Sequence, residues 1–171
     1  MDGTASSLRI GQGFDVHRFS GAPGRPLVLG GVTIPGATGL AGHSDADVVA
    51  HALADALLGA GGLGDLGRHF PDSDPAWAGA DSLVLLAEVT AMVAAQGLRV
   101  VNADCTVVCE RPRLAEHTSE MIRLLGAVIE APVSVKATRA EGLGALGRVE
   151  GIACLAVALL AGADTNDRPV S

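Results

Sequence analysis

Asp15, His17 and His51 are the residues whose types and spacing best fit a metal site. Asp15 and His17 lie two positions apart at the end of a predicted strand, so both side chains point to the same side, about 7 Å apart at Cα. His51 lies in the second turn of a predicted helix. One carboxylate and two imidazoles would leave the fourth tetrahedral position of a zinc ion open for substrate. Taken alone, the Asp-x-His pair also fits a turn-capping aspartate beside a hydrogen-bonded histidine.

A dense polar cluster, formed by His43, Ser44, Asp45 and Asp47, lies at the start of that helix. Unpaired backbone N–H groups and the helix dipole favour an anion at such an N-terminus. Ser44 and Asp47 have the spacing of a capping box, which would by itself explain both residues. His43 has no capping role that its neighbours do not fill, so it is the stronger candidate for contact with an anion.

Two glycine-rich loops carry or adjoin carboxylates. The pattern G-x-G-x-x-G occurs at residues 62–67 and 142–147. Neither copy has both the preceding strand and the downstream acidic residue that dinucleotide binding requires, so both are interpreted as loops of close backbone approach. Asp65, Asp72 and Asp74 would accept hydrogen bonds from sugar or polyol hydroxyls. Asp74 precedes a proline and also fits ordinary turn chemistry.

Two arginine-containing segments follow later predicted strands. Arg111 and Arg113 flank Pro112, whose fixed φ favours a turn that would cradle a phosphate and a base. The alternative for these arginines is a solvated surface role. Residues 136–141, K-A-T-R-A-E, place a hydroxyl, a cation and a carboxylate ahead of a glycine-rich loop. That order suits a phosphate chain together with a second divalent ion.

The elements that must position these residues are indicated by hydrophobic periodicity. Strands are predicted over residues 8–14, 27–34, 99–109 and 132–138, and helices over residues 46–60, 82–97, 119–130 and 150–160. The last helix is apolar nearly all round and is expected to be buried on several sides. The order predicts a two-layer α/β sandwich, a mixed four-stranded sheet with helices packed on one face. One domain is expected over residues 1–163, followed by a flexible tail over residues 164–171.

Composition narrows the class of protein. The chain has 171 residues, a formal net charge of −7, and 49% hydrophobic but only 2% aromatic residues. This fits one compact domain with an aliphatic core and excludes a disordered chain. The acidic balance argues against nucleic-acid binding, and the longest apolar run is too short to cross a membrane. The start shows no signal peptide and the three cysteines show no disulfide pattern, so a cytoplasmic protein is expected.

Six segments add a signal that none carries alone: R-I-G-Q-G-F-D-V-H-R-F, L-G-G-V-T-I-P, G-H-S-D-A-D-V-V-A-H-A-L, G-D-L-G-R-H-F-P-D-S-D-P, E-R-P-R-L and G-R-V-E-G-I-A. In this order and spacing they resemble the 2-C-methyl-D-erythritol 2,4-cyclodiphosphate synthase family of the non-mevalonate isoprenoid pathway. The resemblance implies a homotrimer with active sites between neighbouring subunits. It also implies Zn²⁺ on Asp15, His17 and His51, and Mg²⁺ or Mn²⁺ on Glu141 and the substrate diphosphate.

The implied reaction is intramolecular. The 2-phosphate of 4-diphosphocytidyl-2-C-methyl-D-erythritol 2-phosphate attacks the β-phosphorus, CMP leaves, and a cyclic diphosphate forms. The resemblance gives catalytic positions to His43 and Arg139. The substrate contacts that it implies are Asp15, His17, His43, Ser44, Asp65, Leu66, Gly67, Phe70, Asp72, Asp74, Cys109, Glu110, Arg111, Pro112, Arg113, Leu114, Ala115, Thr138, Arg139, Ala140, Glu141, Ala145 and Arg148.

The chain departs from the family pattern at three positions. Arg139 replaces a threonine whose hydroxyl is assigned to transition-state stabilisation; its charge would compensate as an arginine finger does, or its length would block the pocket. Ala145 stands where an aromatic residue is frequent near the threefold axis, while Arg148 and Glu150 keep their places. Arg113 replaces a lysine, which keeps the charge and changes its geometry.

Three functions are compatible with these residues. The first is the metal-dependent cyclase. The second is a catalytically weakened trimer that binds a cytidine nucleotide or an isoprenoid diphosphate. The third, a zinc hydrolase, is disfavoured because no carboxylate is clearly placed to activate water beside the metal.

Overall fold

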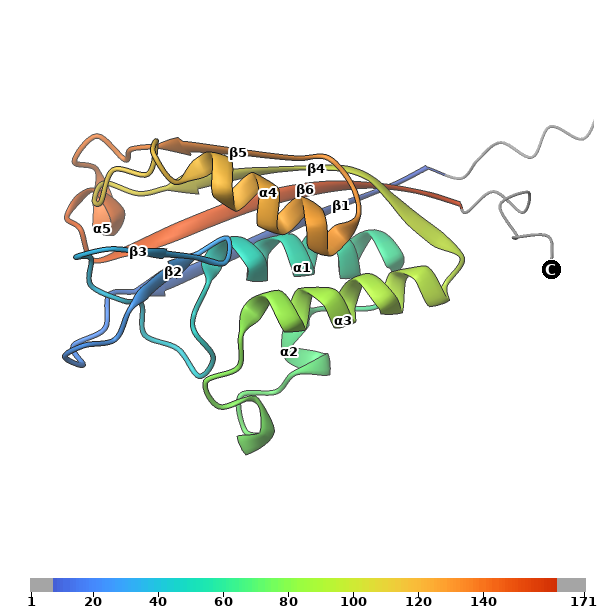
Figure 1. The fold of residues 1–171 in the computed structure, drawn as a ribbon, viewed down its shortest axis with the longest axis horizontal. Helices are drawn as coiled ribbons and strands as arrows, with labels where there is room; N and C mark the ends of the chain where they lie inside the picture. Colours follow the sequence, from blue (N-terminus) through green and yellow to red (C-terminus); the bar gives the residue numbers. More distant parts are fainter. Residues whose placement is uncertain (1–7, 163–171) are drawn as a thin grey trace, which may run out of the picture.

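Residues 8–162 are described by a computed structural model, in which three strands are followed by helical segments and then by alternating strands and helices (Figure 1). The elements are β1 Arg9–Arg18, β2 Leu27–Leu29, β3 Val32–Ile34, α1 Val48–Gly61, α2 Leu66–His69, the 3-10 helix η1 Pro75–Trp77, α3 Ser82–Ala95, β4 Leu98–Val108, α4 Thr118–Ile129, β5 Val133–Thr138, α5 Gly144–Gly147 and β6 Gly151–Gly162.

Four strands form one mixed sheet in the order β1-β6-β4-β5. β6 is antiparallel to both β1 and β4, whereas β4 and β5 are parallel. α1 packs on β1 and β6, α4 packs on β5, and α3 packs on α1, so the longer helices form a layer beside the sheet (Figure 1). The predicted fold class, a mixed four-stranded sheet with helices on one face, is confirmed.

The prediction of a helix over residues 150–160 is wrong, because these residues form the strand β6. Along β6 only Leu155 and Val157 are exposed, and Cys154, Ala156 and Ala158 between and beside them are buried. β6 has a strand on each side and α1 over one face, so nearly all of its positions are apolar. Because nearly all positions are apolar, the sequence of β6 lacks the alternation that marks a strand. Its several alanines favour the prediction of a buried helix.

The predicted strand over residues 27–34 is instead a hairpin of two short strands, β2 and β3, outside the main sheet. Its turn is formed by Gly30 and Gly31, whose φ values of 56° and 77° are those that a two-residue type I′ turn requires. Asp47 accepts the N–H groups of both glycines, at 2.8 and 2.7 Å. The hairpin is thereby attached to the start of α1.

α1 approaches β1 closely because Gly11 and Gly13 lie on the side of β1 that faces the helix. A Cβ atom on Gly11 would lie 1.9 Å from the carbonyl oxygen of Ala56, and one on Gly13 would lie 1.9 Å from that of Ala52. No larger residue fits at either position without displacing the backbone. The short separation brings His51 of α1 within reach of the strand.

The other predicted elements are confirmed, with small differences at their ends. β1 continues past residue 14 to Arg18, because it pairs along its whole length with β6. α1 begins at Val48 rather than at residue 46, because Ala46 has a positive φ of 60° and lies outside the helix. The three cysteines are buried and free. Between residues 8 and 162, no helix has the length and apolar character needed to cross a bilayer. The predicted tail, 164–171, lies outside the described residues, and the domain boundary at residue 163 stays a prediction.

Candidate metal centre and active site

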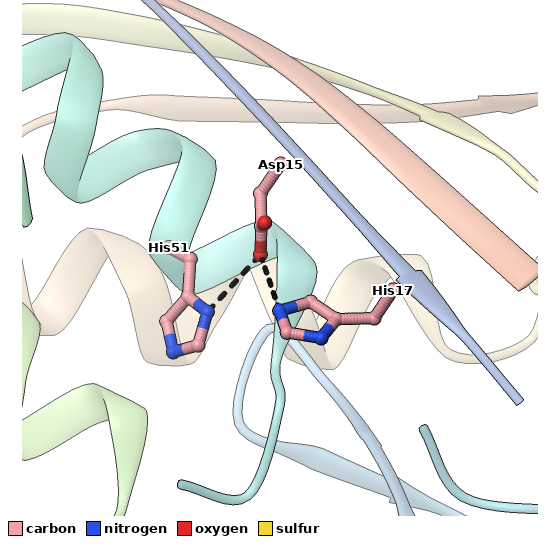
Figure 2. Close-up of side chains that lie close together, drawn as sticks. All are labelled: Asp15, His17 and His51. Carbon is pink, nitrogen blue, oxygen red and sulfur yellow. Dashed lines mark hydrogen bonds and ion pairs between the residues drawn. The ribbon is translucent and has the colours of Figure 1, made fainter. Parts of the chain in front are cut away.

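Asp15, His17 and His51, here called the metal group, converge between β1 and α1 (Figure 2). Asp15 and His17 come from β1, and His51 comes from the N-terminal part of α1. One ligand atom from each residue lies within 4.8 Å of the other two. Asp15 Oδ2 is 3.2 Å from His17 Nε2 and 3.0 Å from His51 Nδ1. The grouping predicted from residue type and spacing is therefore present.

Each imidazole of the metal group turns one nitrogen toward Asp15 and uses the other for a contact with the rest of the protein. His17 Nδ1 is 2.6 Å from the carbonyl oxygen of Ala41, an acceptor, so Nδ1 carries a proton and Nε2 is the nitrogen left for a metal. His51 Nδ1 faces Asp15, while its Nε2 lies 2.8 Å from Ser82 Oγ. Two imidazole nitrogens and one carboxylate oxygen that point to one place fit the ligand preference of Zn²⁺. The second ring nitrogen of each histidine is hydrogen-bonded to the protein, which fixes the orientation of the ring.

The electrostatics of the metal group also suit a cation. Burial acts to raise the pKa of Asp15, but the hydrogen bonds and charges of His17 and His51 outweigh it and hold that pKa well below its ordinary value. The hydrogen bond with Asp15 raises the pKa of His17. The side chains of Asp15 and His17 are 23% and 24% exposed, so a ligand can reach them from solvent.

The N-terminus of α1 is capped by the chain itself, which corrects the prediction of an anion site there. Asp47 is fully buried and accepts the N–H groups of Val49 and Ala50 at 3.0 and 3.1 Å. Burial raises the pKa of Asp47, against the effect of these hydrogen bonds. Ser44 Oγ accepts the N–H of Ala46, and Ala46 has a positive φ and precedes the helix. Ser44 therefore does not cap α1, and the predicted capping box does not form. The amides of Val49 and Ala50 are thus occupied and do not hold an anion.

The loop before α1 places Ser44 beside the metal group. Ser44 Oγ is 3.2 Å from His51 Nε2. His43 Nε2 is 3.2 Å from the carbonyl oxygen of Asp74, which ties this loop to the segment around residue 74. Of these two predicted substrate contacts, Ser44 therefore lies next to the metal group, whereas His43 is held against residue 74.

The segment over residues 65–75 combines capping residues with an exposed carboxylate. Asp65 caps α2 and Asp74 caps η1, each by accepting a backbone N–H at 2.9 Å. Asp72 is exposed, and its charge contributes to the raised pKa of His17. Phe70 is buried in the core, so its ring supports this segment from inside.

Asp55 supports this region and was missed by the sequence analysis. It lies four residues after His51 on α1 and accepts the N–H of Leu66 at 2.7 Å, so it ties α2 to α1. Burial raises the pKa of Asp55, against this hydrogen bond. The contact holds Asp65, Leu66 and Gly67 against α1. The i,i+4 spacing from His51 is the signal by which Asp55 could have been found.

A second set of predicted residues, here called the turn group, comprises residues 109–115 and 138–141. The turn and the end of β5 line a cavity of 190 Å³. Burial raises the pKa of Cys109 to about 11, so its thiol stays protonated at neutral pH. A larger cavity of 720 Å³ shares part of this lining and adds Arg111. The residues common to both cavities are Glu110, Pro112, Arg113 and Arg139.

Arg139 and Glu141 form an exposed ion pair after β5. Arg139 Nη2 is 3.4 and 3.3 Å from the two carboxylate oxygens of Glu141, and the side chains are 59% and 71% exposed. A single carboxylate holds Mg²⁺ only with further oxygens, such as those of a diphosphate. Arg148 and Glu150 form a similar pair at 2.7 Å, and Ala145 is exposed in α5. Arg139, which departs from the family pattern, is thus paired with Glu141, the expected ligand of the second metal.

The metal group and the turn group remain separate within one chain. The metal group lies between β1 and α1, whereas the two cavities are lined by the turn group and its neighbours. Neither of these cavities is lined by Asp15, His17 or His51. The structure therefore assembles the predicted site residues as two groups.

Comparison with known proteins identifies the family. The model of the YgbB family matches residues 8–161. The chain belongs to the YgbB family. This YgbB member is 59% identical over 158 residues to the 2-C-methyl-D-erythritol 2,4-cyclodiphosphate synthase of Symbiobacterium thermophilum, a match that covers 91% of this chain and 99% of the relative. The resemblance predicted from the six segments is confirmed.

Two solved structures resemble this YgbB member in fold. The bifunctional IspDF from Campylobacter jejuni matches with a TM-score of 0.87 and 39% identity over 92% of this chain, which spans only 43% of that protein. IspF from Plasmodium falciparum, in a CDP complex, matches with a TM-score of 0.80 and 28% identity, over 94% of this chain and 100% of that chain.

Proposed function

We propose that this chain is a metal-dependent cyclase that converts 4-diphosphocytidyl-2-C-methyl-D-erythritol 2-phosphate into 2-C-methyl-D-erythritol 2,4-cyclodiphosphate and CMP, in the cytoplasmic non-mevalonate isoprenoid pathway. The observation that carries the proposal is the convergence of Asp15, His17 and His51 in a chain that is 59% identical to a synthase of this name. The CDP complex of the Plasmodium falciparum protein supports a cytidine diphosphate ligand.

The proposed reaction requires the protein to position the reacting groups but not to transfer a proton. An oxygen of the 2-phosphate forms a bond to the β-phosphorus, and the bond from that phosphorus to the CMP oxygen breaks. No general base is needed, because a phosphate monoester has a second pKa of about 6 and is largely ionised near neutral pH. The chain must therefore bring two anionic groups together and offset their charge.

The residues of the metal group and its surroundings would hold the reacting end of the substrate. A zinc ion on Asp15, His17 and His51 would supply charge stabilisation to phosphate oxygens. His43 and Ser44, on the adjoining loop, would contact the 2-phosphate. Asp72, an exposed carboxylate that caps none of the described helices, would accept hydrogen bonds from the erythritol hydroxyls. Asp65 and Gly67 would contact the ribose.

The turn group would hold the nucleotide end. Residues 109–115 would surround the cytosine in the 190 Å³ cavity. Thr138 would donate to a phosphate, and Glu141 would hold Mg²⁺ or Mn²⁺ jointly with the diphosphate. The Arg139 guanidinium, held beside Glu141 by their ion pair, would offset part of the charge of the diphosphate.

A homotrimer would unite the two groups. On the face of the sheet opposite α1, the exposed apolar side chains of β1 and β6 are Ile10, Phe14, Val16, Leu155 and Val157. A continuous apolar surface of this kind favours contact with another protein surface. We assign it to contacts between copies of the chain, arranged so that the metal group of one subunit meets the turn group of its neighbour.

The test is a CMP-release assay with folded protein loaded with zinc and magnesium. We expect CMP and the cyclic diphosphate in equal amounts, measured by chromatography and by ³¹P NMR. No CMP above background refutes the cyclase. CMP or CDP binding in calorimetry without turnover would support the weakened binding trimer, and a linear product would support a hydrolase. Sedimentation velocity tests the trimer.

A further inference from the structure

His51 uses its second ring nitrogen for a contact with a buried serine, which extends the metal group into the core. Nδ1 faces Asp15, and Nε2 lies 2.8 Å from Ser82 Oγ. Ser82 is the first residue of α3 and is 1% exposed. A histidine that offers Nδ1 to a metal carries its proton on Nε2. His51 therefore donates and Ser82 Oγ accepts.

The single hydroxyl proton of Ser82 is directed to Asp45. Ser82 Oγ donates to Asp45 Oδ1, and the backbone N–H of Ser82 donates to Asp45 Oδ2 at 3.1 Å. A continuous series of hydrogen bonds thus runs from His51 through Ser82 to a carboxylate, and every donor in it meets an acceptor. Partners of this kind fix the tautomer and the ring orientation of a metal-binding histidine.

Helix capping does not explain the position of the Ser82 side chain. The N-cap of α3 is Asp81, whose carboxylate accepts the N–H of Leu83 at 2.8 Å. Ser44 Oγ is a second neighbour of His51, at 3.2 Å, but it already accepts a backbone N–H of its own loop. Ser82 is the closer partner, and its hydroxyl has no other role in the helix.

We propose that Ser82 and Asp45 are positioning residues of the metal group, which hold His51 with its proton on Nε2 and thereby raise the affinity for zinc. The proposal rests on the zinc site of the proposed function but does not depend on the proposed reaction. The contact is not predictable from the sequence, because Ser82 and His51 are 31 positions apart.

The first experiment measures zinc affinity without substrate, by competition with a chromophoric chelator. Ser82→Ala is expected to raise the zinc Kd by about 10-fold or more, within the 10–100-fold range of such partners. Asp81→Ala is the matched control: it removes the cap of α3 next to Ser82 and is expected to lower the melting temperature while leaving the zinc Kd unchanged. A zinc Kd of Ser82→Ala within twofold of the wild type overturns the proposal.

The second experiment observes the ring proton of His51 directly, and its decisive measurement is made on the wild type. In the zinc-loaded wild type, ¹⁵N-edited NMR is expected to show a slowly exchanging proton on His51 Nε2, and in Ser82→Ala that proton should exchange faster. Absence of a protected Nε2 proton in the wild type overturns the proposal, as does failure of the wild type to bind zinc. A chain that passes both experiments but releases no CMP contradicts the proposed reaction alone.

Discussion

The metal group and the turn group are constructed in opposite ways. In the metal group each histidine is anchored by a second contact inside the chain, His17 with Ala41 and His51 with Ser82. In the turn group the charged side chain of Arg139 is 59% exposed, and among residues 8–162 its hydrogen-bond partner is the nearby Glu141. The contrast indicates that the fold of one chain anchors the metal group but leaves Arg139 and Glu141 exposed. In the proposed trimer, substrate or a neighbouring subunit would complete the turn group.

Of the variants considered, loss of His51 should have the largest effect on activity and on zinc binding. His51→Ala is expected to reduce CMP release by at least about 1000-fold, because loss of a metal ligand exceeds the 10–100-fold cost of losing a supporting partner. Bound zinc, measured by elemental analysis, should fall in parallel. His117→Ala is the control, because His117 starts α4 without a side-chain capping bond and lies outside the metal group. Zinc content equal to that of the wild type in His51→Ala would contradict the assigned site.

The close packing of α1 on β1 predicts the next largest effect, on stability. Gly13→Ala would place a methyl group 1.9 Å from a carbonyl oxygen of α1, and overpacking of this kind costs about 3 kcal/mol, roughly 150-fold in the folding equilibrium. Gly21→Ala is the matched control, since nothing lies within 4 Å of its Cβ position and no strain is expected. Denaturant unfolding measures both. Equal stabilities would show that α1 can move away from β1 without cost.

The pH dependence of zinc binding tests the charge balance of the metal group. The hydrogen bond with Asp15 raises the pKa of His17, so the stabilising ion pair of the metal-free protein is present below pH 6.5 and is lost as pH rises through the raised pKa. Zinc affinity should move the opposite way and fall by at least about 10-fold per pH unit well below that pKa, because the metal must displace the proton of His17. Calorimetry in buffers of different ionisation enthalpy counts the proton. Zinc binding without proton release below that pKa would contradict this prediction.

The local parts of the metal group are predictable from sequence, and its supports are not. Asp15 and His17 share one side of a strand, which their spacing of two predicts. The approach of His51 depends on glycines that let α1 approach β1, and its contact with Ser82 joins residues 31 positions apart. No local pattern encodes such contacts, so they emerge only from the packed structure.

The lack of a local sequence signal also explains the two wrong predictions of secondary structure, at residues 150–160 and 27–34. In β6 the buried alanines and the exposed Leu155 and Val157 are all apolar, so the period of two that marks a strand is lost from the sequence. In the hairpin, Gly30 and Gly31 were the correct signal of a turn, but the apolar residues on both sides suggested one uninterrupted strand. Local periodicity fails in the first case because the exposed and the buried positions of β6 are both apolar, and in the second because the two strands are so short.

The smallest effect is expected at Arg139, in the exposed turn group. Arg139→Thr frees the Glu141 carboxylate, so CMP release should reach half-maximum at a lower Mg²⁺ concentration. The change should not exceed about fivefold, because an exposed ion pair contributes at most about 1 kcal/mol. Arg123→Thr removes a comparable exposed pair, with Glu120 on α4, and should leave the Mg²⁺ dependence unchanged. A change far above fivefold would mean that Arg139 contacts the substrate itself, so the turn group would be more strongly prepared than its exposure indicates.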